Sequence, residues 1–342
     1  MENSIDMNPT GRRPQARRFV LLIGWMCIAV AARAAGVRDL KIPADGRGPE
    51  IAVQLWAPCS APPAPIMVHR GTVRLAIRGV QDCAPSGKRL PLIVISHGML
   101  EDLYSHHDTA EFLADAGFAV VTLSHPQDAV FSSKDTVDNM SSFLVRPIDI
   151  QRTITFVLSP SQAAVDIDSR RIGFFGFSRG GYTGLVLAGA VPNFHRLLFP
   201  CPEALLMCRQ IRDNDVPAEI SRYEPRIKAY VIADPISFFP DKVSLNKVAA
   251  PIQLWSSEHG GMGVRPGDVA SVRGNLPHAP EFHRPANSVH FSFLFPCSEE
   301  EAKVMSFQCT DALGFDRAEF HRRFNAQVLT FFLKNLTGYN GR

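Results

Sequence analysis

The 342-residue sequence lacks the features that mark several classes of protein. It has no large excess of one charge, since 36 Lys and Arg stand against 33 Asp and Glu, and this near balance argues against a nucleic-acid partner. The uncharged apolar run Phe19–Ala32 is shorter than the ~20 residues of a membrane-spanning helix. No Cys-x-x-Cys pair occurs, so metal-thiolate and thioredoxin-type sites have no support. The sequence contains no internal repeat that would indicate a solenoid, and no low-complexity block that would indicate a disordered chain.

The N-terminus has the pattern of a secretory signal. Arginines within 12–18 precede the apolar run Phe19–Ala32, and an Ala-Arg-Ala triplet of the small-x-small type ends at Ala34. A basic region, a short apolar stretch and such a cleavage site are the three parts of a signal peptide. We therefore predict that residues 1–34 are a signal peptide, that the protein is exported to the periplasm or the extracellular space, and that the mature chain starts at Ala35. An uncleaved single membrane anchor is the alternative.

The cysteines fit an exported protein. Cleavage would remove Cys27 from the seven cysteines and leave six, an even number that is compatible with disulfide bonds. Pairing each cysteine with its nearest neighbour would close three local loops and is the simplest prediction; the pairs are 59–83, 201–208 and 297–309. The alternative is that these residues are free, buried thiols.

The mature chain begins with β-like segments and continues with an alternation of aliphatic runs and helix-like segments. Strands are expected at 51–58, 67–77, 90–96, 118–123, 172–177, 227–233 and 251–255, and helices at 107–116, 148–158, 179–190 and 315–336. This alternation predicts an α/β fold with a mostly parallel central sheet and helices on both faces. We assign residues 35–342 to a single domain.

Two stretches exceed what a minimal fold of this kind needs. Residues 125–147 and 191–225 are rich in Pro and Asp and contain scattered aromatic residues, among them Phe131 and Phe199. Long connections in a compact domain usually have a function, and these two would lie at the edge of the sheet where ligands bind. We predict that they are cap or lid insertions that shape a pocket.

The strongest chemical signal is the Gly-x-Ser-x-Gly sequence from Gly176 to Gly180. It lies between an aliphatic strand and a helix rich in small residues, which is the context that a nucleophile elbow requires. In such a turn the glycines let backbone segments pass closely, and the Ser178 hydroxyl projects at the positive end of the following helix. The alternative is an ordinary Gly-rich turn with an incidental serine.

A serine nucleophile needs a base, and with this motif the base follows the serine in the chain. His290 is the first candidate because it follows the last predicted strand and precedes an apolar segment. His283 ranks second and His259 third. His195, before the next strand, and His321, in the terminal helix, are less suitable.

Two acids could orient that base. Asp234 directly follows the strand 227–233, and Glu258 follows the strand 251–255 closely. Both positions are stereochemically possible, because the acid in this kind of enzyme can come from either of two neighbouring strands. An Asp before Pro235 could also be only a turn former.

The oxyanion formed by such a serine needs two backbone N–H donors. One is expected from Arg179, directly after Ser178, and the other from Met99, after the tight turn that Gly98 permits. His97 precedes this turn, and we expect it to brace the loop rather than to act as a second base.

These motifs, in their order, resemble one family. The segments LIVISHGML, FLADAGFAVVTLSHP, RIGFFGFSRGG and NSVHFSF resemble the platelet-activating-factor acetylhydrolase and predicted dienelactone hydrolase group of α/β-hydrolases, over roughly residues 50–335. The resemblance implies an α/β-hydrolase fold and assigns the nucleophile to Ser178, the acid to Asp234 and the base to His290, which favours Asp234 over Glu258. It also places the oxyanion hole at the Met99 and Arg179 backbone amides.

The chain departs from this family in the 191–225 insertion with its two cysteines. It also differs from authentic dienelactone hydrolases, which use a cysteine where Ser178 stands.

The expected activity is that of an exported serine hydrolase of carboxylic esters, with small-molecule esters as substrates and no cofactor or metal. The resemblance favours short acyl chains, on phospholipids or aromatic acids. An amidase or peptidase with the same triad is one alternative. A non-catalytic hydrolase fold used for binding is another, but it would predict that a triad residue is missing, and none is.

Overall fold

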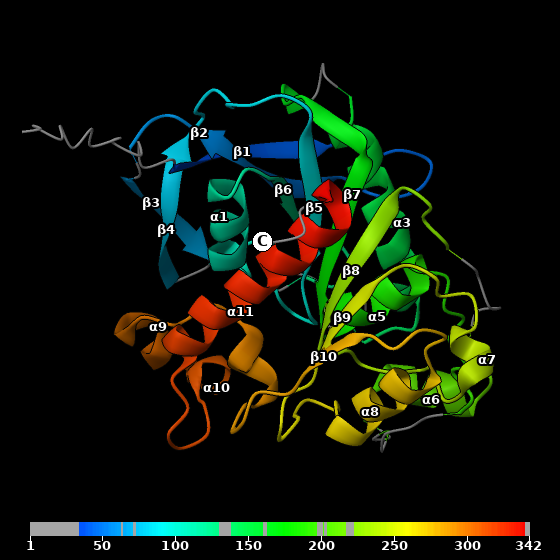
Figure 1. Cartoon of the computed structure of the whole chain (residues 1–342). Helices are drawn as coiled ribbons and strands as arrows, with labels where there is room; N and C mark the ends of the chain where they lie inside the picture. The colour runs from blue at the N-terminus through cyan, green and yellow to red at the C-terminus, as the bar shows by residue number, and fades with distance from the viewer. Residues whose placement is uncertain are drawn as a thin grey trace, which may run out of the picture. The chain divides into compact units, whose positions relative to one another are not determined.

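The computed structural model describes residues 34–62, 64–70, 73–129, 138–159, 163–196, 201, 204–216 and 222–338. The predicted signal peptide and Cys27 lie outside the described residues, apart from Ala34. Among the described residues, ten strands form one sheet in the order β10-β9-β8-β7-β5-β6-β2-β1-β4-β3 (Figure 1). None of the helices in these ranges is long and apolar enough to cross a membrane.

The strands divide into a parallel half and a mainly antiparallel half. From β10 to β6 in the sheet order all neighbours are parallel, whereas β2 is antiparallel to both β6 and β1, and β3 is antiparallel to β4. The strands are β1 (Ala34–Ile42), β2 (Ile51–Cys59), β3 (Ala64–Arg70), β4 (Val73–Gln81), β5 (Leu90–Ser96), β6 (Ala119–Leu123), β7 (Ile167–Phe177), β8 (Ile227–Ala233), β9 (Ile252–Trp255) and β10 (Glu281–His283).

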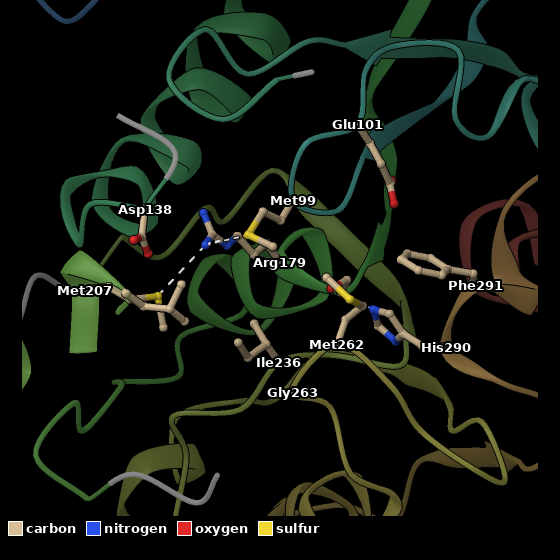
Figure 2. Close-up of a pocket in the computed structure, with 12 residues that line it drawn as sticks. Met99, Glu101, Asp138, Arg179, Met207, Ile236, Met262, Gly263, His290 and Phe291 are labelled. Atoms are coloured by element: carbon tan, nitrogen blue, oxygen red, sulfur yellow. Dashed lines mark hydrogen bonds between the residues drawn. The ribbon is translucent and has the colours of Figure 1, made fainter. Parts of the chain in front are cut away.

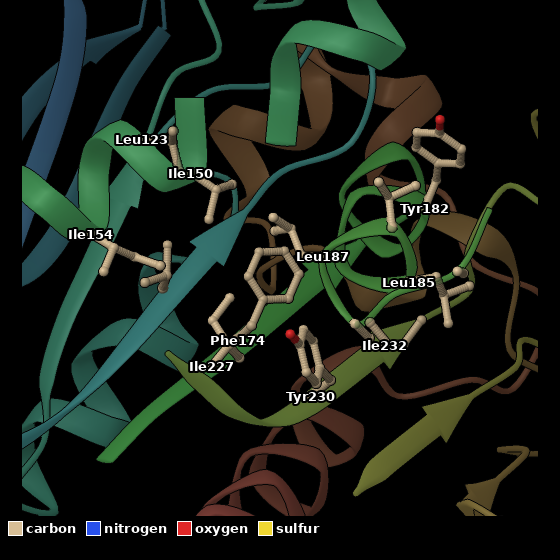
Figure 3. Packing of buried hydrophobic residues seen from close by; sticks show 14 of the residues in the cluster. Leu123, Ile150, Ile154, Phe174, Tyr182, Leu185, Leu187, Ile227, Tyr230 and Ile232 are labelled. Carbon is tan, nitrogen blue, oxygen red and sulfur yellow. The ribbon is translucent and has the colours of Figure 1, made fainter. Parts of the chain in front are cut away.

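Helices cover both faces of the sheet, as predicted. Along β5, Leu92 and Val94 face a core shared with α3 and α5, and Ile93 and Ile95 face a core shared with α1 and α11. Figure 1 shows α1 and α11 across one face, and Figure 3 shows Phe174 of β7 within the other core. The helices are α1 (His107–Asp115), α3 (Ser141–Val157), α5 (Arg179–Leu187), α6 (Leu206–Arg212), α7 (Lys242–Leu245), α8 (Pro266–Asn275), α9 (Glu299–Val304), α10 (Ser306–Cys309) and α11 (Arg317–Phe332).

Burial on both faces explains why the parallel strands are so apolar. All seven residues of β5 and all five of β6 are buried, so each strand must present apolar side chains in both directions. Because each fully buried aliphatic or aromatic side chain contributes about 1.5–3 kcal/mol, these strands fix the centre of the sheet. Their carboxyl ends therefore give a rigid edge on which side chains can be positioned.

Two predicted boundaries are wrong. The β-like run 67–77 spans two antiparallel strands, in which Met67 pairs with Ala76, because strand alternation has the same period on both sides of a chain reversal. The helix predicted at 148–158 begins at Ser141 and contains Pro147. Proline removes a helical hydrogen bond and normally marks a helix start or break, and so the sequence pattern placed the first turns in a loop.

The cysteines of the described chain form the three predicted bonds. Disulfides join Cys59 to Cys83, Cys201 to Cys208, and Cys297 to Cys309. The first joins the end of β2 to the residues after β4. The second ties α6 to the segment before it, and the third closes the loop that carries α9 and α10.

Candidate active site

The Gly-x-Ser-x-Gly segment forms a tight turn between β7 and α5. Ser178 has a φ of +55°, a left-handed conformation that is strained for a residue with a Cβ. A Cβ at Gly176 would lie 2.2 Å from the Gly180 carbonyl oxygen, and a Cβ at Gly180 would lie 2.0 Å from the Ser96 carbonyl oxygen. Both positions therefore require glycine, and the turn has the close backbone packing of a nucleophile elbow.

A chain of hydrogen bonds joins Ser178, His290 and Asp234, and we call it the open chain. The His290 Nε2 lies 3.1 Å from the Ser178 Oγ, and the His290 Nδ1 lies 2.6 Å from the Asp234 Oδ2. Ser178 ends the turn after β7, Asp234 follows β8, and His290 begins a short 3₁₀ helix, His290–Phe293. With Nδ1–H donated to Asp234, the His290 Nε2 accepts the hydroxyl proton of Ser178.

Asp234 is held by further donors. It is fully buried, and its two carboxylate oxygens accept hydrogen bonds from the backbone N–H and the hydroxyl of Ser257, each at 2.8 Å. Sequence reasoning missed Ser257, although its position two residues after β9, at the same edge of the sheet as Asp234, was an available signal. These donors and His290 together hold the carboxylate in one orientation.

Glu258, the alternative acid, is not part of the open chain. Its carboxylate is partly exposed and accepts a hydrogen bond from the Asn287 backbone N–H at 2.7 Å. The side chain of Ser257, its neighbour, reaches Asp234 instead. The two acids that the sequence could not separate thus have different partners in the structure.

The other candidate histidines also lie outside the open chain. His283 stacks on Trp255 with ring centroids 4.1 Å apart, and its Nε2 contacts Glu281. His259 and His195 are exposed. His321 forms a pair with Asp108, and its Nε2 donates to the Ser292 carbonyl oxygen at 3.0 Å, so it braces the segment that carries His290.

Two backbone segments meet beside Ser178. One is the start of α5, where Arg179 is the first residue, and the N–H groups of a first helical turn have no intrahelical partners. The other is the loop after β5, which leads through His97 and Gly98 to Met99. The His97 Nδ1 contacts the Gly98 carbonyl oxygen at 2.6 Å, and this matches the bracing role expected of His97.

The open chain faces a cavity of about 440 Å³. Figure 2 shows the side chains around it. Its described lining residues are Met99, Glu101, Asp138, Ser178, Arg179, Leu205, Met207, Ile236, Met262, Gly263, His290 and Phe291. The lining is mainly apolar, and three of its side chains are methionines, which adapt to irregular apolar groups. No group of three or more His, Cys, Asp or Glu residues that could hold a metal occurs in the part of the chain that is described.

Both stretches predicted as insertions contribute to this lining. Asp138 belongs to 125–147, and Leu205 and Met207 belong to 191–225. Parts of both stretches, with Phe131 and Phe199, lie outside the described residues.

The Arg179 side chain is a feature that sequence reasoning did not use. Its Nη1 lies 3.0 Å from the Asp128 Oδ2, and its Nη2 lies 3.0 Å from the Met99 Sδ. Its guanidinium carbon is 4.5 Å from the centre of the Phe143 ring. Figure 2 shows this side chain reaching between Met99 and Met207, away from His290, so the turn at Ser178 also supplies part of the cavity wall.

Comparison with known proteins identifies the fold. No protein-family model matches the chain, and no curated protein matches it either. Among solved structures, a ferulic acid esterase from Streptomyces cinnamoneus is similar over 92% of this chain and 93% of its own, with a TM-score of 0.61 and 15% sequence identity. Identity this low shows the fold alone. Together with the mixed sheet covered by helices on both faces, it establishes that the chain has the α/β-hydrolase fold.

Proposed function

We propose that this protein is a serine hydrolase of carboxylic esters. The observation that carries the proposal is the open chain: three residues from three separate segments form a continuous Ser–His–Asp hydrogen-bond chain, and both Ser178 and His290 line a cavity. The similarity of fold to a ferulic acid esterase supports an ester as the substrate.

The proposed reaction proceeds through an acyl-enzyme. The Ser178 Oγ attacks the ester carbonyl while the His290 Nε2 takes its proton, and Asp234 stabilises the imidazolium that forms. The backbone N–H groups of Met99 and Arg179 stabilise the negative charge on the carbonyl oxygen. His290 then returns the proton to the departing alcohol. A water molecule, deprotonated by His290, attacks the acyl-enzyme; the acyl–Oγ bond breaks, His290 gives the proton to the Ser178 Oγ, and the acid is released.

The cavity supports a proposal for the substrate class. A mainly apolar cavity of about 440 Å³ can take an aliphatic or aromatic acyl group, and it is larger than an acetyl group requires. The family resemblance favours short acyl chains, and the ferulic acid esterase favours an aromatic acid. We propose short or aromatic acyl esters, with the 125–147 and 191–225 stretches as the cap that limits chain length.

The three disulfides support export. Disulfides persist in oxidising compartments, which suits delivery through the signal pattern at residues 1–34. We propose that the mature enzyme acts in the periplasm or outside the cell.

Active-site labelling tests the proposal. A fluorophosphonate probe should label the wild type and not the Ser178→Ala variant, while Ser306→Ala, a change at an exposed serine of α10, should label as the wild type does. Equal labelling of wild type and Ser178→Ala would overturn the assignment of the nucleophile. A folded wild-type protein that neither reacts with the probe nor hydrolyses any ester would favour a binding role.

Hydrolysis of nitrophenyl esters then tests the substrate. We expect acetate, butyrate and a feruloyl ester to be cleaved faster than palmitate or a matched anilide. A faster reaction with the anilide would favour the amidase alternative.

A further inference from the structure

A second Ser–His–Asp chain lies behind the site. The Ser96 Oγ is 2.9 Å from the His125 Nε2, and the His125 Nδ1 is 3.0 Å from the Asp149 Oδ2. We call these three residues the buried chain, because Ser96 and His125 have no exposed surface and Asp149 has 3%. None of them is among the described residues that line the cavity. Ser96 therefore has no access to substrate, and the buried chain must serve a different purpose from the open chain.

Arg146 of α3 contacts this chain and the loop beside it. Its Nη2 donates to the His97 carbonyl oxygen and, at 3.3 Å, to the Ser96 Oγ. The loop is held at further points: the His125 backbone N–H donates to the His97 Nε2 at 3.0 Å, and the Gly98 backbone N–H donates to Glu101 at 2.8 Å. The backbone that leads to Met99 is thus fixed by several hydrogen bonds at successive residues.

The same guanidinium also contacts the nucleophile helix. The Arg146 Nε donates to the Thr183 Oγ1 at 3.3 Å, one turn into α5, and the Thr183 hydroxyl donates to the Arg179 carbonyl oxygen. The Arg146 Nη1 is 2.7 Å from the Asp128 Oδ2, which also binds the Arg179 side chain. One fully buried arginine therefore joins the loop that ends at Met99 to the helix that begins at Arg179.

We propose that Arg146 is a positioning residue that sets the separation of the two oxyanion-hole amides, with the buried chain as its support. This proposal rests on the proposed function. The donors must lie within about 2.7–3.1 Å of the oxyanion, and a displacement of about 1 Å can cost about 100-fold in rate. Because the bound ester has no oxyanion and the charge develops only on the way to the tetrahedral intermediate, loss of this alignment lowers kcat and leaves KM nearly unchanged.

The variant that tests it is Arg146→Lys, and the chain offers a matched control in Arg152→Lys. Arg152 is on the same helix and equally buried, but it donates to the Pro43 and Pro49 carbonyl oxygens. Its Nη1 also lies 3.8 Å from the Asp149 Oδ1, and a lysine at 152 keeps a positive charge on that side of Asp149. A lysine at 146 keeps the charge beside Asp128 and cannot contact all the Arg146 partners at once. We expect kcat to fall about 10- to 100-fold in Arg146→Lys, with KM within about threefold. Arg152→Lys should keep kcat while losing stability.

Inhibition by a trifluoromethyl ketone separates positioning from a general loss of structure. Such a ketone forms a tetrahedral oxyanion adduct with an active-site serine, so its affinity should fall with kcat in Arg146→Lys and stay unchanged in Arg152→Lys. Equal kcat and equal inhibitor affinity in the two variants would overturn the positioning role. If Arg146→Lys does not fold, Thr183→Val removes the hydroxyl that accepts from the Arg146 Nε and donates to the Arg179 carbonyl oxygen, and it should lower kcat about 3- to 10-fold; an unchanged kcat would again overturn the positioning role. A wild type that does not hydrolyse esters would instead refute the proposed function.

Discussion

The open chain and the buried chain contain the same three residue types in the same hydrogen-bond order, and their surroundings differ. In the open chain the serine occupies a strained turn at the start of α5 and faces the cavity. In the buried chain the serine is the last residue of β5 and has no exposed surface. The two hydrogen-bond distances are 2.6 and 3.1 Å in the open chain and 2.9 and 3.0 Å in the buried chain. A Ser–His–Asp geometry is therefore insufficient to identify a nucleophile, because access and nearby oxyanion donors decide which serine can react.

The test with the largest expected effect replaces each of the two serines by alanine, in separate variants. We expect Ser178→Ala to lower kcat/KM by at least about 10⁴-fold, because it removes the proposed nucleophile, and Ser96→Ala to keep more than about a tenth of the activity. Fluorophosphonate labelling and ester hydrolysis measure both. A folded Ser96→Ala protein that the fluorophosphonate probe does not label would contradict the assignment of the reactive serine to the open chain.

The acids give the next contrast. Asp234→Asn should lower kcat by about 10⁴-fold, because an amide cannot stabilise the imidazolium and leaves His290 in the wrong tautomer. Asp149→Asn, at the equivalent position of the buried chain, should cost less than about tenfold. Glu258→Gln should leave kcat within about twofold, since its carboxylate bonds to Asn287. Kinetics on a soluble ester would measure all three, and a severe loss in Glu258→Gln with an active Asp234→Asn would reverse the assignment of the acid.

The difference between the chains also shows how much the sequence could predict. The tight turn at Ser178 was predictable because its motif is local: two glycines, a strand before and a helix after. Asp234 and Glu258 both follow strands, and only the folded geometry shows which one reaches His290. The fold class was predictable for the same reason as this turn, since aliphatic runs of parallel strands are local signals.

The buried chain was not predictable, because its members share no local pattern. His125 lies where the sequence predicted an insertion, and Asp149 lies in the middle of α3, whose first turns were hidden by Pro147. The short strand β10 has exposed and partly buried residues and no apolar run that could reveal it. Contacts between segments far apart in the sequence decide these features, and a single sequence does not encode them in adjacent residues.

The turn that carries Ser178 meets the buried chain where Gly180 lies against Ser96, and this contact can be broken. A Cβ at Gly180 would be 2.0 Å from the Ser96 carbonyl oxygen, so Gly180→Ala must push β5 and α5 apart. We expect a loss of about 3 kcal/mol or more in the free energy of unfolding. Gly274→Ala in α8 is the control, because nothing lies within 4 Å of its Cβ position and alanine is favoured in helices by about 0.5–1 kcal/mol. Urea denaturation measures both, and equal stability in Gly180→Ala and wild type would show that the contact is not tight.

The smallest expected effect concerns how burial controls the charge of histidines near the site. In the buried chain, burial and Arg146 lower the pKa of His125, while burial raises the pKa of Asp149 to about 7. A lowered histidine pKa and a raised aspartate pKa change the proton balance between the folded and unfolded chains in opposite directions, so the two shifts oppose each other in the pH dependence of stability. His106 differs: it packs edge-on against Phe175 and Phe177, and burial lowers its pKa to about 3.

The unfolded chain therefore protonates His106 below its ordinary pKa of 6.5, whereas the folded chain does not until about pH 3. Stability contributed by the neutral ring is present above pH 6.5 and is lost as the pH falls, by up to about 1.4 kcal/mol per pH unit. His106→Gln removes this group, so we expect a less stable protein whose free energy of unfolding falls less steeply between pH 7 and pH 5. Urea denaturation of wild type and variant at pH 8, 7, 6 and 5 measures the two slopes. Equal slopes would mean that His106 titrates alike in both states, and that burial near Phe177 does not exclude a proton from a histidine.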